Sequence, residues 1–168
     1  MHNDKLDVSQ LTQKDFEYDN FHIALEGRLY RSGQIPAERL AAYLTKFNIK
    51  TIINLRGWAE RTVCCRGEEE AAASVGATVL YAPMSASRAS TKEEIDTLLK
   101  HFDAATEPLL IHCSQGINRT GEACALWFLY KNGAPNEEAL KQFDAKFGYV
   151  FEKRPEKYET IKAWRRKK

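Results

Sequence analysis

The stretch "PLLIHCSQGINRTGEACALWFLY", residues 108–130, decides the fold of this chain. Its first four residues form an unbroken apolar run typical of a buried strand, and an apolar run typical of a buried helix begins near Gly121. Between the two runs lies the short polar loop "HCSQGINRT", residues 112–120. A cysteine and an arginine therefore stand where a buried strand turns into a buried helix.

The rest of the chain alternates predicted strands and helices. Strands are expected within residues 21–36, as a hairpin or two edge strands, and over residues 51–55, 78–83 and 108–112. Helices are expected from Pro36, over residues 68–75, from a capping box at residues 91–94, and over residues 120–132, 136–147 and 155–166. This order predicts an α/β fold with a mostly parallel central sheet flanked by helices on both faces. Ligands of such sheets bind at the carboxyl ends of strands, which is where Cys113 falls.

The length predicts one domain, and the net charge bears on the kind of partner. The chain has 168 residues, with 25 Lys and Arg against 23 Asp and Glu. Residues 1–20 are polar without a clear period and are expected to form an N-terminal arm, and residues 21–168 a single domain. The near-neutral charge argues against a nucleic-acid or membrane-surface partner.

No segment resembles a targeting or membrane element. The chain has no apolar stretch of membrane-span length, and its first ten residues lack the basic and apolar regions of a signal peptide. We therefore expect a cytoplasmic protein, and as a separate expectation we take it to be a monomer. The four cysteines, Cys64, Cys65, Cys113 and Cys124, lack the paired spacing of a zinc site, so no metal or other cofactor is expected.

The loop at residues 112–120 has the composition of an anion site. Its backbone N–H groups can turn inward, and the following helix adds the positive end of its dipole. Gly116 allows a tight approach, and the planar guanidinium of Arg119 matches two phosphate oxygens. The predicted phosphate-binding residues are Ser114, Gln115, Gly116, Ile117, Asn118 and Arg119.

Cys113 is the predicted nucleophile of this loop. Helix N-termini and nearby cations lower the pKa of cysteine thiols, so the side chain is expected to be a thiolate. A thiolate aimed at the phosphorus of a bound anion provides covalent catalysis. The loop amides and Arg119 supply the positive charge that the reaction needs, without a metal ion.

Residues 112–121 resemble the signature of the cysteine-dependent protein-tyrosine-phosphatase superfamily, in which His-Cys is followed by five residues and then Arg-Thr. The stretches "LYRSGQ" at 29–34, "TIINLRG" at 51–57 and "VLYAPMSASR" at 79–88 are similar to compact bacterial dual-specificity-type phosphatases and to the related phosphatase-like phytases. The resemblance covers roughly residues 21–150. It implies the protein-tyrosine-phosphatase fold and a phosphatase domain over residues 21–168.

The same resemblance implies a role for each residue of the loop that matches the family. Cys113 would form a phosphocysteine intermediate, and Arg119 would clamp the transition state. The hydroxyl of Thr120 would ease departure of the sulfur. His112 would support the loop and would not act as a base.

One part of the family pattern is missing. Most of these phosphatases carry an aspartate after the preceding strand, where it protonates the leaving oxygen, but residues 84–90 read "MSASRAS". The nearest carboxylates, on Glu93, Glu94 and Asp96, fall on the following helix, where capping and a solvated face explain them. We therefore assign no general acid.

Basic residues near strand ends bear on the substrate. Arg31, Arg56 and Arg88 could form a positive rim around the loop, which favours a phosphorylated small molecule of the inositol polyphosphate (phytate-like) class. A missing acid harms an aryl ester less than an alkyl ester, which favours phosphotyrosine protein instead. The predicted function is thus a phosphomonoester hydrolase leaning to inositol polyphosphates, with a protein tyrosine or dual-specificity phosphatase as the alternative.

Two other functions and one regulatory device are also open. A degenerate phosphate-binding module would explain the missing aspartate. A rhodanese-like sulfurtransferase also uses a cysteine loop, although it would not require Arg119 followed by Thr120. Oxidation could pair Cys64 or Cys65 with Cys113, because thiolates of low pKa are the susceptible ones.

Overall fold

The computed structural model describes residues 7–57, 65 and 67–167. Five strands form one sheet in the order β1-β2-β5-β3-β4, with β1 at His22–Leu25, β2 at Leu29–Ser32, β3 at Thr51–Asn54, β4 at Thr78–Tyr81 and β5 at Leu109–His112. β1 runs antiparallel to β2, and every other neighbouring pair is parallel. The predicted mostly parallel sheet is therefore confirmed, with β5 at its centre.

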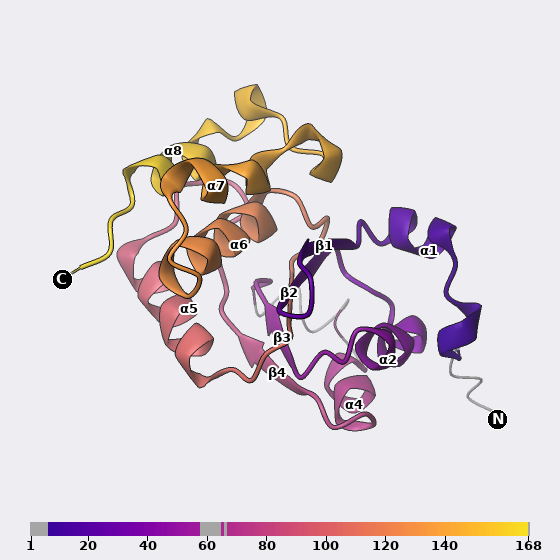
Figure 1. Cartoon of the computed structure of the whole chain (residues 1–168). Coiled ribbons are helices and arrows are strands. Elements are labelled where there is room, and N and C mark those ends of the chain that lie inside the picture. Colours follow the sequence, from indigo (N-terminus) through magenta and orange to yellow (C-terminus); the bar gives the residue numbers. More distant parts are fainter. Residues whose placement is uncertain (1–6, 58–64, 66, 168) are drawn as a thin grey trace.

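Helices cover both faces of this sheet (Figure 1). One side carries α1 at Gln13–Tyr18, α2 at Ala37–Lys46 and α4 at Glu68–Ala73. The other carries α5 at Lys92–Ala104, α6 at Asn118–Tyr130, α7 at Asn136–Leu140 and α8 at Pro155–Ala163. Short 3-10 turns lie at Val8–Gln10, Lys141–Phe143, Ala145–Phe147 and Phe151–Lys153.

The two faces of β5 pack into two separate cores. Leu109 and Ile111 belong to the core under α5 and α6, whereas Leu110 belongs to the core under α2 and α4. Successive side chains of a strand point to opposite faces, so a strand with a core on each face is apolar throughout. This burial explains why Leu109–Ile111 carry no polar side chain, and it holds the following loop on a rigid support.

One detail differs from the sequence-based expectations. Residues 136–147 do not form one helix, because α7 ends at Leu140 and two 3-10 turns follow. The backbone carbonyl of Gln142 accepts a hydrogen bond from Arg31 at 2.8 Å, and Asp144 adopts an extended conformation, which ends the helical path. The N-terminal arm contains α1, whose Phe16 packs on Phe21 and Tyr43 at the edge of a core.

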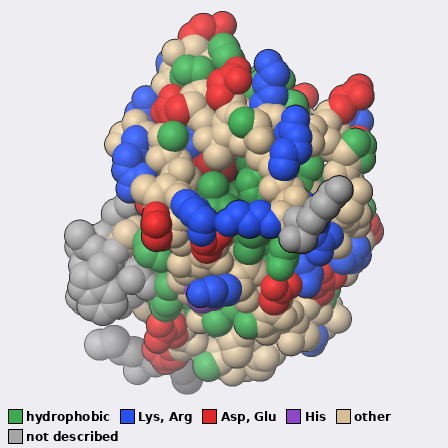
Figure 2. All heavy atoms as spheres, turned by 90° about the vertical axis from the view of Figure 1, so that its left-hand side faces the viewer, with side chains coloured by type: hydrophobic (Ala, Val, Ile, Leu, Met, Phe, Trp, Pro, Cys, Tyr) green, Lys and Arg blue, Asp and Glu red, His purple; other side chains and the backbone are tan. Residues whose placement is uncertain are grey.

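A second hollow lies away from the loop at residues 112–120. It has a volume of about 600 Å³ and lies between α5 and the C-terminal residues 164–167. Figure 2 shows this side of the molecule, where basic side chains lie among acidic and hydrophobic ones. Within the described residues, no helix is both long enough and apolar enough to cross a membrane.

Candidate active site

The loop after β5 is packed against the segment after β2 through two glycines. Gly116 has a φ of +73°, and a Cβ built on it would lie 2.4 Å from the backbone N of Gly33. A Cβ on Gly33 would in turn lie 2.9 Å from the carbonyl oxygen of Ser114. Both close approaches require glycine, so the glycines of "YRSGQ" and "HCSQGINRT" serve the same backbone contact.

The thiol of Cys113 sits inside this loop and receives hydrogen bonds from it. The backbone N–H of Gly116 donates to Sγ at 3.3 Å, and the hydroxyl of Thr120 donates at 3.0 Å. Burial by itself would raise the pKa of Cys113, but the charge of Arg119 and these hydrogen bonds hold it below its ordinary value. The arrangement favours a buried thiolate.

Arg119 and the thiol line one small cavity. The cavity has a volume of about 100 Å³, and its described lining residues are Ala86, Cys113, Ser114, Gln115, Ile117, Asn118 and Arg119. Arg119 is only 5% exposed, so solvent screens its charge little, and the charge acts strongly on the nearby thiol of Cys113. The cavity is thus lined by all of the predicted phosphate-binding residues of the loop except Gly116, whose N–H donates to Sγ of Cys113.

His112 forms a buried ion pair that the sequence does not reveal. Its Nε2 lies 2.5 Å from a carboxylate oxygen of Glu68 on α4, and its Nδ1 lies 3.1 Å from the carbonyl oxygen of Cys113. Burial would lower the pKa of His112, but the carboxylate of Glu68 raises it above its usual value. Asn54 on β3 donates to the same carboxylate at 2.8 Å, which fixes its orientation.

Arg31 is not part of a solvent-facing rim, so that prediction is wrong. It is 0% exposed, because every residue of β2 is covered. Its guanidinium donates to the carbonyl oxygens of Gly116 at 3.1 Å and of Gln142 at 2.8 Å, and it lies 3.8 Å from the ring centre of Phe147. Arg31 therefore supports the outer side of the loop and does not reach toward solvent.

The other two arginines of the predicted rim, Arg56 and Arg88, are more exposed than Arg31, but both form side-chain contacts. Arg88 forms a two-pronged ion pair with Glu94 on α5, with both N–O distances at 3.0 Å. Arg56 donates to the side chain of Gln34 at 3.3 Å. Neither residue lines the cavity at Cys113. Cys64, one of the two candidate oxidation partners of Cys113, lies outside the described residues.

The loop at residues 84–90 forms the remaining wall of the cavity. Its Ala86 lines the cavity. Among the described residues that line it, none is a carboxylate.

The described cysteines besides Cys113 are buried. Cys65 contacts Gln34 at 3.1 Å and Asn54 at 3.3 Å. Cys124 lies on α6, where burial raises the pKa of its thiol to about 12. A thiol of such high pKa is a poor nucleophile, so Cys124 has a packing role.

These features together define a class of protein. A buried thiol of lowered pKa, a loop of inward backbone N–H groups and an arginine stand at the carboxyl end of the central strand of an α/β sheet. This is the arrangement of a cysteine-dependent phosphatase of the protein-tyrosine or dual-specificity type. The chain belongs to the family described as a DSP-PTPase phosphatase fused to NAD+ kinase, whose model matches residues 6–158.

Solved structures share the fold. TpbA of P. aeruginosa superposes with a TM-score of 0.67 and 24% identity, covering 89% of this chain and 87% of TpbA. The catalytic core of Siw14 gives a TM-score of 0.64 and 17% identity, over 88% of this chain and 85% of that one. Tk-PTP in its active form gives a TM-score of 0.61 and 22% identity, over 86% of this chain and 95% of Tk-PTP. No curated protein matches the chain by sequence.

Proposed function

We propose that this phosphatase hydrolyses phosphate monoesters through a phosphocysteine on Cys113. The thiolate attacks phosphorus, so an S–P bond forms while the bond from phosphorus to the ester oxygen breaks. Water then attacks the phosphocysteine, the S–P bond breaks, and inorganic phosphate leaves. The observation that carries this proposal is the pair of hydrogen bonds to Sγ, from Gly116 and Thr120, inside a cavity that also holds Arg119.

The other residues of the loop have separate roles in this reaction. The guanidinium of Arg119 and the loop N–H groups stabilise charge on the transferring phosphoryl oxygens. The hydroxyl of Thr120, at 3.0 Å from Sγ, stabilises the thiolate when the phosphocysteine is hydrolysed. His112, paired with Glu68, holds the start of the loop.

We propose aryl phosphates, phosphotyrosine among them, as the preferred esters. No carboxylate stands among the described residues that line the cavity, so the leaving oxygen departs with little help from a protein acid. A phenol, with a pKa near 10, leaves far more readily than an aliphatic alcohol under these conditions. The TpbA structure that holds phosphotyrosine shows that this ligand fits the shared fold in that protein.

A groove beside the cavity supports a polypeptide substrate. It has a volume of about 620 Å³ and shares Ser114, Gln115 and Ile117 with the cavity at Cys113. Tyr18 lines it with 83% of its surface exposed, and Lys146 lines it as well. An exposed aromatic ring and a cation next to the phosphate site suit the residues that flank a phosphotyrosine in a peptide.

Inositol polyphosphate is the second candidate substrate. The three arginines that favour it do not all face the site, because Arg31 is buried and Arg88 is paired with Glu94. Arg56 and Lys146 are the described cations beside Gln34 and the groove that could still attract a polyanion. A phosphate next to the scissile one could also lend a proton, which would replace the missing acid.

Initial rates on four substrates test these proposals. They are a small aryl phosphate, a phosphotyrosine peptide, inositol hexakisphosphate and NADP, the last because the family description names NAD+ kinase. We expect turnover of the two aryl esters, none by Cys113→Ser, and a trapped phosphoenzyme in a single turnover. Higher kcat/KM for inositol hexakisphosphate would overturn the aryl preference, and a wild-type protein that binds phosphate without turnover would leave only the binding module.

The groove has its own test. Tyr18→Ala should raise KM for the phosphotyrosine peptide while leaving the small aryl phosphate unchanged, because only the peptide reaches the groove. Ile23→Ala removes an exposed side chain that does not line the groove and serves as the control. An equal effect of Tyr18→Ala on both esters would contradict peptide binding there.

A further inference from the structure

A buried ion pair lies beneath the wall of the active-site cavity. Glu122 on α6 and Lys157 on α8 are both 0% exposed, and their charged atoms are 2.8 Å apart. Glu122 lies four residues after Asn118, on the same face of α6, and Asn118 lines the cavity. The pair is therefore one helical turn below the site of the reaction.

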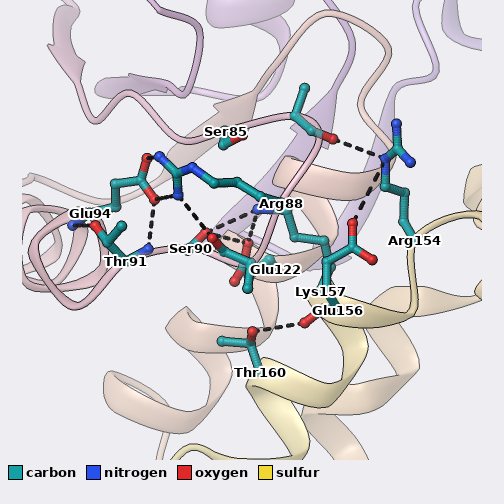
Figure 3. A network of polar contacts seen from close by, with 12 residues as sticks. Ser85, Arg88, Ser90, Thr91, Glu94, Glu122, Arg154, Glu156, Lys157 and Thr160 are labelled. Carbon is teal, nitrogen blue, oxygen red and sulfur yellow. Dashed lines mark hydrogen bonds and ion pairs between the residues drawn. The ribbon is translucent and has the colours of Figure 1, made fainter.

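The pair is connected to the loop at residues 84–90. The hydroxyl of Ser90 donates to Glu122 at 2.8 Å and accepts from Lys157 at 3.0 Å, so one loop residue bridges both charges (Figure 3). Since Ser90 immediately precedes Thr91, the residue that caps α5, the end of the loop is fixed on both sides.

The same C-terminal segment holds the loop a second time. Arg154, three residues before Lys157, donates from Nε to the carbonyl oxygen of Ala86 at 3.1 Å. Ala86 is the loop residue that lines the cavity at Cys113. Arg88 adds a third attachment through its ion pair with Glu94. Three of the loop residues between 86 and 90 are thus tied to α5, α6 or the segment that enters α8.

The pair is poorly explained by stability alone. Removing two charges from water is costly, and well-packed apolar residues often do as well or better at the same place. One carboxylate oxygen of Glu122, Oε1, has no hydrogen-bond partner within the described residues, so the pair is not fully satisfied. A role in holding the loop at residues 84–90 would explain why this buried ion pair is present although it does not maximise stability.

We propose that the Glu122–Lys157 pair is a positioning device that holds residues 86–90 against α6 as a fixed wall of the cavity. The inference rests on the proposed hydrolysis at Cys113, because the wall is expected to place the leaving group in line with the sulfur. It assigns α8 to the active site, although α8 contributes no residue to the cavity lining that the structure describes. Glu122 and Lys157 act through the loop and do not contact the reacting atoms.

The test replaces both charges at once. In Glu122→Leu/Lys157→Met, no unpaired charge remains, so thermal stability should equal or exceed that of the wild type. The catalytic efficiency kcat/KM for an aryl phosphate should nevertheless fall by up to about 10²-fold, because small misplacements are costly to catalysis. The pH profile of Cys113 alkylation should not move, since Gly116, Thr120 and Arg119 still surround the thiol. Wild-type kcat/KM in the folded double variant would overturn the proposal.

Hydrogen exchange provides a readout that does not depend on turnover. Amides of residues 85–90 should exchange faster in the double variant. Arg154→Ala and Ser90→Ala keep both Glu122 and Lys157 and serve as the test if the double variant does not fold. The same amides should exchange faster in these two variants as well. Lys153→Ala, an exposed neighbour of Arg154, is the matched control and should exchange like the wild type. If the amides of residues 85–90 exchanged at the wild-type rate in both Arg154→Ala and Ser90→Ala, the positioning role would be wrong. If the wild type showed no turnover, only the proposed function would be contradicted.

Discussion

The hydroxyl of Thr120 lies 3.0 Å from Sγ of Cys113, although the two residues are seven positions apart along the chain. The loop returns on itself so that the first turn of α6 faces the end of β5. This contact, together with the N–H of Gly116 and the charge of Arg119, offsets a burial that would otherwise keep the thiol protonated. The reactivity of Cys113 therefore depends on a few identifiable groups.

Removing the hydroxyl of Thr120 should raise the pKa of Cys113. Thr120→Val keeps the shape of the side chain but donates no hydrogen bond to the thiolate, whereas Thr120→Ser keeps the donor. The rate of alkylation by iodoacetamide, measured against pH, reports the thiolate directly. Its midpoint should move to higher pH in the valine variant and stay near the wild-type value in the serine variant. Identical profiles in all three proteins would contradict this role.

Replacing Arg119 by lysine should slow the reaction even though the charge is kept. A lysine ammonium cannot present two parallel donors to a phosphoryl group. Loss of such transition-state contacts typically lowers kcat by about 10² to 10³-fold. Steady-state rates on an aryl phosphate give the comparison, with Lys153→Ala as a control for charge on the surface. A kcat equal to that of the wild type would exclude Arg119 from the reaction.

Gly116→Ala should destabilise the fold more than the same change at Gly76. Both glycines have similar φ, +73° and +75°, so an alanine costs about 1 to 2 kcal/mol of conformational strain at either position. Only at Gly116 would the new Cβ collide with backbone, 2.4 Å from the N of Gly33, which adds about 1 to 3 kcal/mol. Urea unfolding of the two variants measures the difference. Equal losses would show that the loop can move away from Gly33.

The pair between His112 and Glu68 should stabilise the protein most between pH 4.5 and 6.5, the ordinary pKa values of the two side chains. The pKa of His112 is raised in the folded state, so its contribution is present below pH 6.5 and is lost as pH rises through the raised value. The pKa of Glu68 is lowered, so its contribution is lost only as pH falls through that lowered value.

Glu68→Gln tests this pH dependence. Within that window the variant should lose about 3 to 5 kcal/mol of unfolding free energy, because one partner of a buried pair is left alone. The deficit relative to wild type should shrink at higher pH, where His112 becomes neutral in both proteins. Urea unfolding across a pH series provides the measurement, with Glu69→Gln, an exposed neighbour on α4, as the control. A deficit that grows with pH would contradict the assigned charges.

Arg31→Met should weaken the loop for every substrate. It leaves the carbonyl oxygens of Gly116 and Gln142 without their donor, which costs about 1 to 3 kcal/mol for each buried group. A rim residue would instead affect polyanions selectively. The ratio of kcat/KM for inositol hexakisphosphate to that for an aryl phosphate should therefore stay constant in Arg31→Met. A fall in kcat/KM for inositol hexakisphosphate alone would instead support a role of Arg31 in binding polyanions.

The sequence predicts the loop and its support well because the residues involved are close together in the chain. Cys113 and Arg119 are six positions apart between a strand and a helix, so local structure alone brings them near one another. The apolar run of β5 and the capping box at Thr91 follow from short-range patterns in the same way. The helix predicted over residues 136–147 fails because a side chain from β2 binds the carbonyl of Gln142.

What the sequence determined by itself is therefore the class of fold and the position of Cys113 in the loop after β5. The tertiary structure decided that Arg31 lies inside, that Glu68 pairs with His112, and that Lys157 reaches Glu122. These pairs join residues that are distant in the chain, and each charge is buried only once sheet and helices have packed around it. Periodicity identifies which segments are apolar, but it carries no information on which buried polar side chain meets which partner.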